Sequence, residues 1–164
     1  MKIKNQLPYF FSLFYIKLKI QSNLRNDFFD KNCFYCKIFF INHDLSVLDD
    51  IMRDDYIQHN DIAEQGKAGF IALFEQTFKA MPDFKYTINR LVAEDDFVVA
   101  YCTTSGTHTD DYWLNVPPHG GKLNFDVVDI FRVQDGKIAE HWDVADRLTL
   151  FTQLGVVDDI GPSK

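Results

Sequence analysis

A β-hairpin signal within residues 126–146, DVVDIFRVQDGKIAEHWDVAD, constrains the fold of this chain more than any other stretch. Two strand-like runs flank Gln134-Asp135-Gly136, and Asp-Gly between apolar runs is among the stronger short hairpin signals. Asp129 and Asp143 lie in the middle of these runs. Because an unpaired carboxylate is costly to bury, both side chains either face solvent or line a site.

The turn of this hairpin decides which side chains share a face. A two-residue Asp-Gly turn places Asp129 opposite Trp142. A three-residue turn, with a left-handed glycine and a bulge, instead puts Asp129, His141 and Asp143 on one face. A shift of one residue moves every side chain of a strand to the other face, so the sequence leaves both registers open.

Length and charge narrow the class of protein. The 164 residues, 46% of them apolar, suit one domain with a proper core. The net charge is −7, of which residues 1–26 contribute +5, so the remainder carries −12. Nucleic-acid binding needs a basic face to neutralise phosphates, so we expect no nucleic-acid partner.

Residues 1–26 differ from the rest of the chain. Their apolar run, Leu7–Ile16, lies between lysines and is shorter than the roughly 20 residues of a membrane-spanning helix. No Ala-x-Ala-like cleavage site follows it. A membrane-surface segment, an uncleaved export signal and an extension outside the fold all remain open, and we favour the extension. We therefore expect one domain over residues 27–157 and a tail over 158–164.

The three cysteines, Cys33, Cys36 and Cys102, cannot form a closed disulfide framework. A reducing, cytoplasmic compartment is the simpler interpretation. Cys33 and Cys36 have the spacing of a redox or zinc half-site, but no second pair of ligands follows. We interpret both as apolar residues in the core face of a helix.

Apolar periodicity predicts helices first and antiparallel strands afterwards. The expected helices lie over 27–40, over 44–52 with a cap at Asp44 and an end at Asp54-Asp55, and over 66–81 with an aromatic apolar stripe. A short extended piece is expected over 56–60, strands over 84–94, 97–109 and 126–146, and a closing helical turn over 147–154. Helices followed by a run of strands are typical of an α+β domain with helices on one face of a curved sheet. Such a bent sheet leaves a pocket where packing cannot close.

Few side chains are suited to catalysis. A carboxylate on an inward strand position, walled by aromatics, is poised for proton transfer, which favours Asp143 with Asp129 as its partner. His59 at a strand end is equally consistent with a base at the pocket mouth and with an exposed loop residue. For His108 an exposed strand end is slightly favoured. Common nucleotide-binding, hydrolase and zinc-protease motifs are missing, and we expect no metal.

Several short segments occur in the order of one known family: Tyr56–Asn60, Gly106–Thr109, Val116–Pro118, Asp126–Arg132 and Asp135–Asp143. Over residues 27–157 the chain resembles the SnoaL-like polyketide cyclases of the nuclear transport factor 2-like superfamily. That superfamily also contains ketosteroid isomerase and limonene epoxide hydrolase. The resemblance implies a cone-shaped α+β fold with N-terminal helices in the concave face of the sheet.

The resemblance also implies a chemistry. Asp143 would be the general acid/base of an aldol-type ring closure that needs no cofactor or metal. Asp129 would face the pocket, as in ketosteroid isomerase, whose matching aspartate works protonated in an oxyanion hole. Polyketide cyclases tend to have histidine there instead. The resemblance favours the three-residue turn, and it implies a homodimer through the outer sheet face that would bury Trp142.

Three hypotheses follow. The first is a lyase, cyclase or isomerase acting on a small apolar carbonyl compound, with Asp143, Asp129 and His59 in the chemistry. The residues expected to bind its substrate are Asn60, His108, Trp113 and His141. The second is a non-catalytic ligand-binding or dimerisation module of the same fold. The third is membrane contact through residues 1–26.

Overall fold

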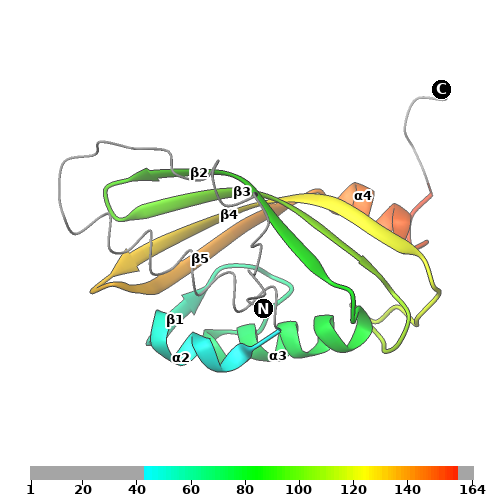
Figure 1. Ribbon diagram of the computed structural model, residues 1–164, viewed down its shortest axis with the longest axis horizontal. Helices are drawn as coiled ribbons and strands as arrows, with labels where there is room; N and C mark the ends of the chain where they lie inside the picture. Colours follow the sequence, from blue (N-terminus) through cyan, green and yellow to red (C-terminus); the bar gives the residue numbers. More distant parts are fainter. Residues whose placement is uncertain (1–42, 159–164) are drawn as a thin grey trace, which may run out of the picture.

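The computed structural model describes residues 43–158, which form a five-stranded curved sheet with helices on its concave side (Figure 1). The elements are η2 (Leu45–Val47), α2 (Leu48–Ile51), β1 (Met52–Gln58), α3 (Gly66–Ala80), β2 (Lys85–Glu94), β3 (Phe97–Thr107), β4 (Lys122–Gln134), β5 (Lys137–Ala145) and α4 (Arg147–Gln153). The α+β prediction is confirmed. The predictions for residues 1–26, for the helix over 27–40 with Cys33 and Cys36, and for the tail after 158 lie outside the described residues.

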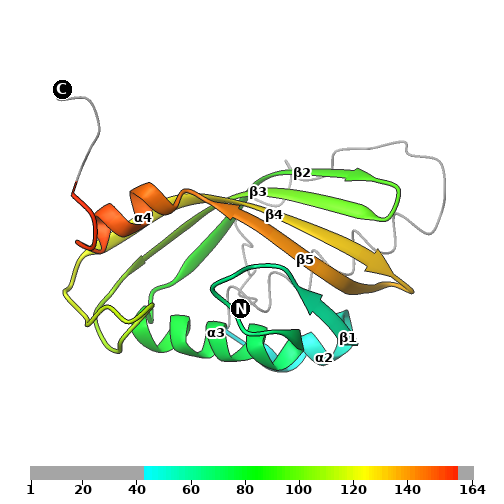
Figure 2. The same cartoon turned by 180° about the vertical axis from the view of Figure 1, so that it is seen from behind.

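The strand order of the sheet is β1-β5-β4-β3-β2. Strand β1 runs parallel to β5, and every other neighbouring pair is antiparallel. Seen from behind, the long strands arch over α2 and α3, while α4 lies at the far end of β4 and β5 (Figure 2). The concave face of the sheet and α3 therefore enclose the interior of the domain.

The central hairpin combines features of both predicted registers. Asp135 and Gly136 have φ of 52° and 75°, and Gln134 pairs with Lys137, so the turn has two residues. A β-bulge at Ala139 then shifts the register, which places Asp129 opposite Asp143. The three-residue turn is wrong, but the face that it predicted is formed because the extra residue lies in the strand.

Two apolar clusters make the core. One joins α2, β1 and β5 around Leu48, Met52 and Ile138, and the other joins the end of α3 to the sheet and α4 around Met81 and Leu123. Phe74 and Phe78 of α3 pack against both clusters, as the predicted aromatic stripe requires. Each large apolar side chain buried in this way stabilises the fold by roughly 1.5–3 kcal/mol.

Local signals set the ends of the short helices. The side chain of Asp44 accepts a hydrogen bond from the Ser46 backbone and caps η2, as predicted. Asp146 caps α4 in the same way through Thr149. The expectation that Asp54 and Asp55 end the helix over 44–52 is wrong, because the chain turns into β1 at Met52.

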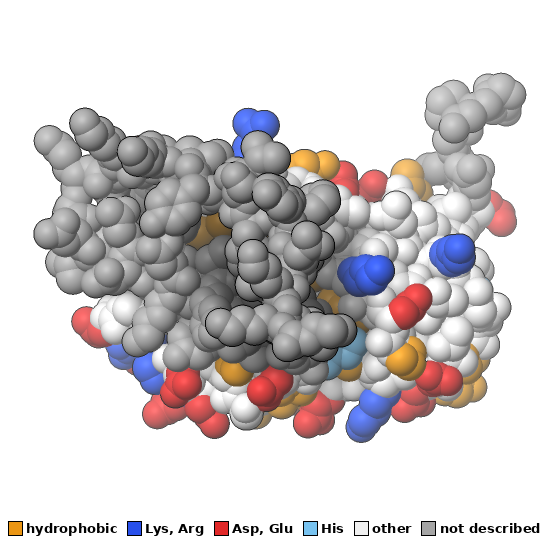
Figure 3. All heavy atoms as spheres, viewed as in Figure 1, with side chains coloured by type: hydrophobic (Ala, Val, Ile, Leu, Met, Phe, Trp, Pro, Cys, Tyr) orange, Lys and Arg blue, Asp and Glu red, His pale blue; other side chains and the backbone are white. Residues whose placement is uncertain are grey.

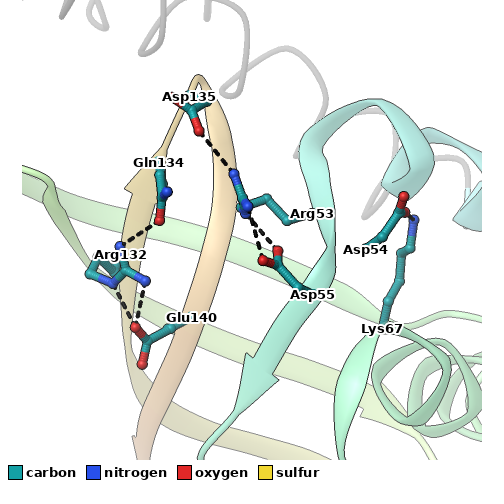
Figure 4. Close-up of polar contacts among 8 residues, drawn as sticks. All are labelled: Arg53, Asp54, Asp55, Lys67, Arg132, Gln134, Asp135 and Glu140. Atoms are coloured by element: carbon teal, nitrogen blue, oxygen red, sulfur yellow. Dashed lines mark hydrogen bonds and ion pairs between the residues drawn. The ribbon is translucent and has the colours of Figure 1, made fainter.

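Charged side chains connect β1 to the hairpin through ion pairs. Arg53 of β1 donates to Asp55 and reaches Asp135 at the turn, with N–O distances of 2.6 and 2.9 Å (Figure 4). Beside it, Arg132 and Glu140 form an ion pair across β4 and β5 (Figure 4). Acidic side chains gather along the edge formed by α2 and α3 (Figure 3). Ion pairs that solvent reaches are each worth about 0–1 kcal/mol, so the pairs of Arg53 orient this edge more than they stabilise it.

Candidate active site

A cavity of about 120 Å³ lies between α3 and the concave face of the sheet. Most of its wall is apolar and aromatic, contributed by Phe70, Phe74, Phe84, Trp113, Phe125 and Leu150. Polar side chains gather where β1, β4 and β5 meet: Gln58, Asn60, Asp129, His141 and Asp143. This combination of an apolar wall and a few convergent polar groups is typical of a small-molecule site.

Asp129 and Asp143 both line this cavity, as predicted, and they are direct neighbours across β4 and β5. Asp129 is only 7% exposed. Burial raises the pKa of the Asp129 carboxyl, and the charge of Asp143 adds to the increase. Contact with His141 opposes that increase without cancelling it. Asp129 therefore keeps its proton to a higher pH than an exposed aspartate does, and it lies beside a second carboxyl.

Two side chains hold the Asp129 carboxyl. The hydroxyl of Tyr86, on β2, donates to Oδ2, and Nε2 of His141 lies 2.9 Å from Oδ1. The His141 ring is fixed by aromatic neighbours, with Phe131 stacked at 4.8 Å and Phe70 edge-on at 6.0 Å between ring centroids. Asp129 therefore has both oxygens engaged in one orientation.

Asp143 has a different partner. The side-chain amide of Asn60 donates to Asp143 Oδ1, and Asn60 Oδ1 accepts from the Ile62 backbone at 2.6 Å. This contact arises because β1 pairs in parallel with β5, so that Gln58 lies beside His141 and the chain beyond it reaches Asp143. The predicted role of Asn60 in the pocket fits this placement.

His59 lies elsewhere, which corrects its predicted place at the pocket. Its ring stacks on Trp142 with centroids 4.3 Å apart, and Nε2 is 2.8 Å from Glu140. Since strand side chains alternate, the inward direction of Gln58 and Asn60 sends His59 to the outer face. It does not line the cavity.

His108 is fully buried, so the expectation of an exposed strand end is wrong. It does not line the cavity either. Its Nε2 donates to the Asp111 carbonyl at 2.8 Å, and its Nδ1 faces the Nδ1 of His119 at 3.2 Å. These contacts fold the loop over residues 108–121. Trp113 of that loop does line the cavity, and its indole N–H donates to Thr77 at 2.9 Å.

Sequence reasoning missed three side chains at the polar end. Gln58 and Tyr56 could have been found, because they precede Asn60 at strand spacing on the same face. Tyr56 is buried, its hydroxyl has no hydrogen-bond partner among the described residues, and burial followed by the two aspartate charges raises its pKa. No local signal points to Tyr86, which approaches from the opposite edge of the sheet.

Comparison with known proteins agrees with this geometry. The family model for SnoaL-like polyketide cyclases matches residues 33–154. The chain belongs to this family. No curated protein matches it. As a SnoaL-like domain it is similar to TsrD from Streptomyces laurentii, at 29% identity and TM-score 0.73, over 80% of this chain and 97% of TsrD.

Two further solved structures are similar to this SnoaL-like chain. AclR from Streptomyces galilaeus, a candidate hydroxylase, is 30% identical with TM-score 0.64, over 72% of this chain and 74% of AclR. IdmH from Streptomyces antibioticus, a candidate polyketide cyclase, is 28% identical with TM-score 0.62, over 73% of this chain and 92% of IdmH. The solved structures similar to this chain thus include proteins assigned to more than one chemistry.

Residues 43–158 contain neither a candidate metal cluster nor a helix suited to crossing a membrane. No three His, Cys, Asp or Glu side chains there lie close enough to share a metal ion. None of the helices in that part is both long and apolar enough to cross a membrane.

Proposed function

We propose that this SnoaL-like protein is a cofactor-independent cyclase, isomerase or lyase acting on a small neutral carbonyl compound. Asp143 takes a proton from the carbon next to the carbonyl. The acid proton of Asp129 turns from His141 Nε2 to the carbonyl oxygen as negative charge develops there. The observation that carries the proposal is the pairing of two carboxyls in one cavity with different surroundings. Two titratable groups whose environments differ in this way can divide acid and base roles.

The remaining cavity residues have supporting roles in the proposal. Asn60 orients Asp143 through its side-chain amide, and Trp113 forms part of the apolar wall. His141 acts through Asp129 rather than on the substrate. His59 has no part in the chemistry, because its ring lies on the outer face.

Proton exchange at carbon tests the proposal without knowledge of the natural substrate. β-Tetralone, a small neutral aryl ketone, is incubated in D₂O, and loss of its α-proton signal is followed by NMR. Wild type should accelerate exchange, and Asp143→Asn should lose most of that acceleration, since a placed base contributes roughly 10²–10⁴ in rate. Equal exchange by both proteins would refute the role of Asp143. Binding without exchange by wild type would favour a ligand-binding module.

We also propose that two copies associate through the outer face of the sheet. Tyr101 and Val144 are 41% and 69% exposed there, and Ile57 of β1 is 44% exposed. Trp142 lies among them, stacked on His59. Aromatic and aliphatic side chains gathered on one open sheet face are suited to burial against a second copy.

A further inference from the structure

A chain of hydrogen bonds crosses the polar end of the cavity and connects four strands. It runs from Gln58 on β1 through His141 on β5 and Asp129 on β4 to Tyr86 on β2. Gln58 Oε1 lies 3.1 Å from His141 Nδ1, and His141 Nε2 lies 2.9 Å from Asp129 Oδ1. The donors and acceptors along this chain determine how many protons it holds.

The orientation of the Gln58 amide comes from its own strand end. The backbone N–H of Asn60, which can only donate, lies 3.3 Å from Gln58 Oε1. A flipped amide would set the Gln58 NH₂ against that N–H, so the oxygen faces it. The same oxygen faces His141 Nδ1, and two acceptors cannot bond to each other. Nδ1 of His141 therefore carries a hydrogen.

We propose that Gln58 is a positioning residue that holds the His141 hydrogen on Nδ1, so that His141 Nε2 and Asp129 keep one shared proton. With Nδ1 protonated, two arrangements satisfy the 2.9 Å contact. Either Asp129 is a carboxylic acid donating to a bare Nε2, or an imidazolium donates to a carboxylate. Both contain the same single proton. Its loss would set a lone pair of Nε2 against a carboxylate oxygen.

The groups around this pair favour retention of the proton. Tyr86 donates to the remaining Asp129 oxygen, and the Asp143 carboxyl faces the pair from β5. Tyr56 approaches from β1, and its hydroxyl has no hydrogen-bond partner within residues 43–158. Helix α3 contributes the ring of Phe70, and β3 contributes Ala100 opposite Asp129. Two carboxylates in one apolar cavity repel each other, and the shared proton removes one of the charges.

The catalytic use of the shared proton extends the proposed function and rests on it. The pair is electrically neutral and lies beside the carboxylate of Asp143, an arrangement that suits a neutral ligand bearing a carbonyl. When the C–H bond next to the carbonyl breaks, its proton passes to Asp143. The carbonyl oxygen then gains the proton of the Asp129–His141 pair, which leaves an Asp129 carboxylate and a neutral imidazole. Reversal of both transfers restores the site.

Nitrogen NMR of the ligand-free full chain, labelled with ¹⁵N-histidine, tests the proposal. His141 is assigned by comparison with His141→Gln. In wild type, His141 Nδ1 should be directly bonded to hydrogen near neutral pH. Gln58→Glu keeps an acceptor oxygen and should retain that hydrogen, whereas Gln58→Met should lose it in favour of Nε2–H. A bare Nδ1 in wild type, or an unchanged hydrogen in Gln58→Met, overturns the proposal.

The wild-type spectrum decides the question even where Gln58→Met does not fold. The spectra need no ligand, so this test is separate from the ketone-exchange assay. An intact Nδ1–H together with absent exchange would refute the proposed function alone. Exchange activity together with a bare Nδ1 would refute the shared proton alone.

Discussion

Asparagine at residue 129 imitates the protonated form of the aspartate in its cavity. In Asp129→Asn the new NH₂ can donate to His141 Nε2, and the amide oxygen can accept from the Tyr86 hydroxyl. The hydrogen bonds and the volume are preserved, while the titratable proton is gone. The variant therefore isolates the contribution of that proton to stability.

The direction in which stability changes with pH follows from the raised pKa of Asp129, whose main cause is burial. A pKa above the ordinary value of about 3.9 means that the folded chain holds a proton that the unfolded chain releases. The free energy of unfolding of wild type, relative to Asp129→Asn, therefore falls as pH rises from about 3.9 through the raised pKa. One proton gives a slope of about 1.4 kcal/mol per pH unit within that range.

Urea unfolding followed by tryptophan fluorescence between about pH 4 and pH 8 measures this difference. Asp83→Asn is the matched control, because hydrogen bonds from Thr107 lower the pKa of Asp83. Its difference from wild type should change only below about pH 4 and in the opposite direction. A difference between wild type and Asp129→Asn that stays flat across the range would refute the buried, proton-holding Asp129.

Three other substitutions test the fold around the site. Gly69→Ala should destabilise the protein by about 1–3 kcal/mol in urea unfolding, because its Cβ would lie 2.0 Å from the Glu64 carbonyl oxygen. Trp113→Phe should cost about 1–3 kcal/mol in the same assay, since the buried Thr77 hydroxyl loses its indole donor. Val144→Glu should convert a dimer to a monomer in light scattering, because it adds a charge to the outer face.

Each of these three substitutions has a control variant or a result that would contradict it. Gln76→Ala, at an exposed position of α3, should change stability by less than about 0.5 kcal/mol. Trp142→Phe, on the outer face, should cost less than Trp113→Phe if the indole bond to Thr77 matters. A wild type that is monomeric at all concentrations would contradict the proposed dimer.

Short-range signals account for the parts of the fold that the sequence predicted. The apolar stripe of α3, the cap at Asp44 and the hairpin turn at Asp135-Gly136 depend on residues within a few positions of each other. Such features follow from local hydrogen bonds and periodicity. The placement of Asp129 and Asp143 in one cavity was predicted from strand alternation together with family resemblance.

The tertiary structure decided the surroundings of those carboxyls. The bulge at Ala139 depends on how β5 fits between β1 and β4, and it moved the extra residue out of the turn. Tyr86 reaches Asp129 from another strand, 43 residues away in sequence.

By itself, then, the sequence determined most of the elements, the family and the two aspartates. Only the packed sheet decided that Gln58 and Tyr86 would join them and that His59 would face outward. The physical reason is that a strand's period of two fixes side chains relative to their neighbours, but the register between strands fixes them relative to the cavity. That register depends on contacts between distant segments, which no local pattern encodes.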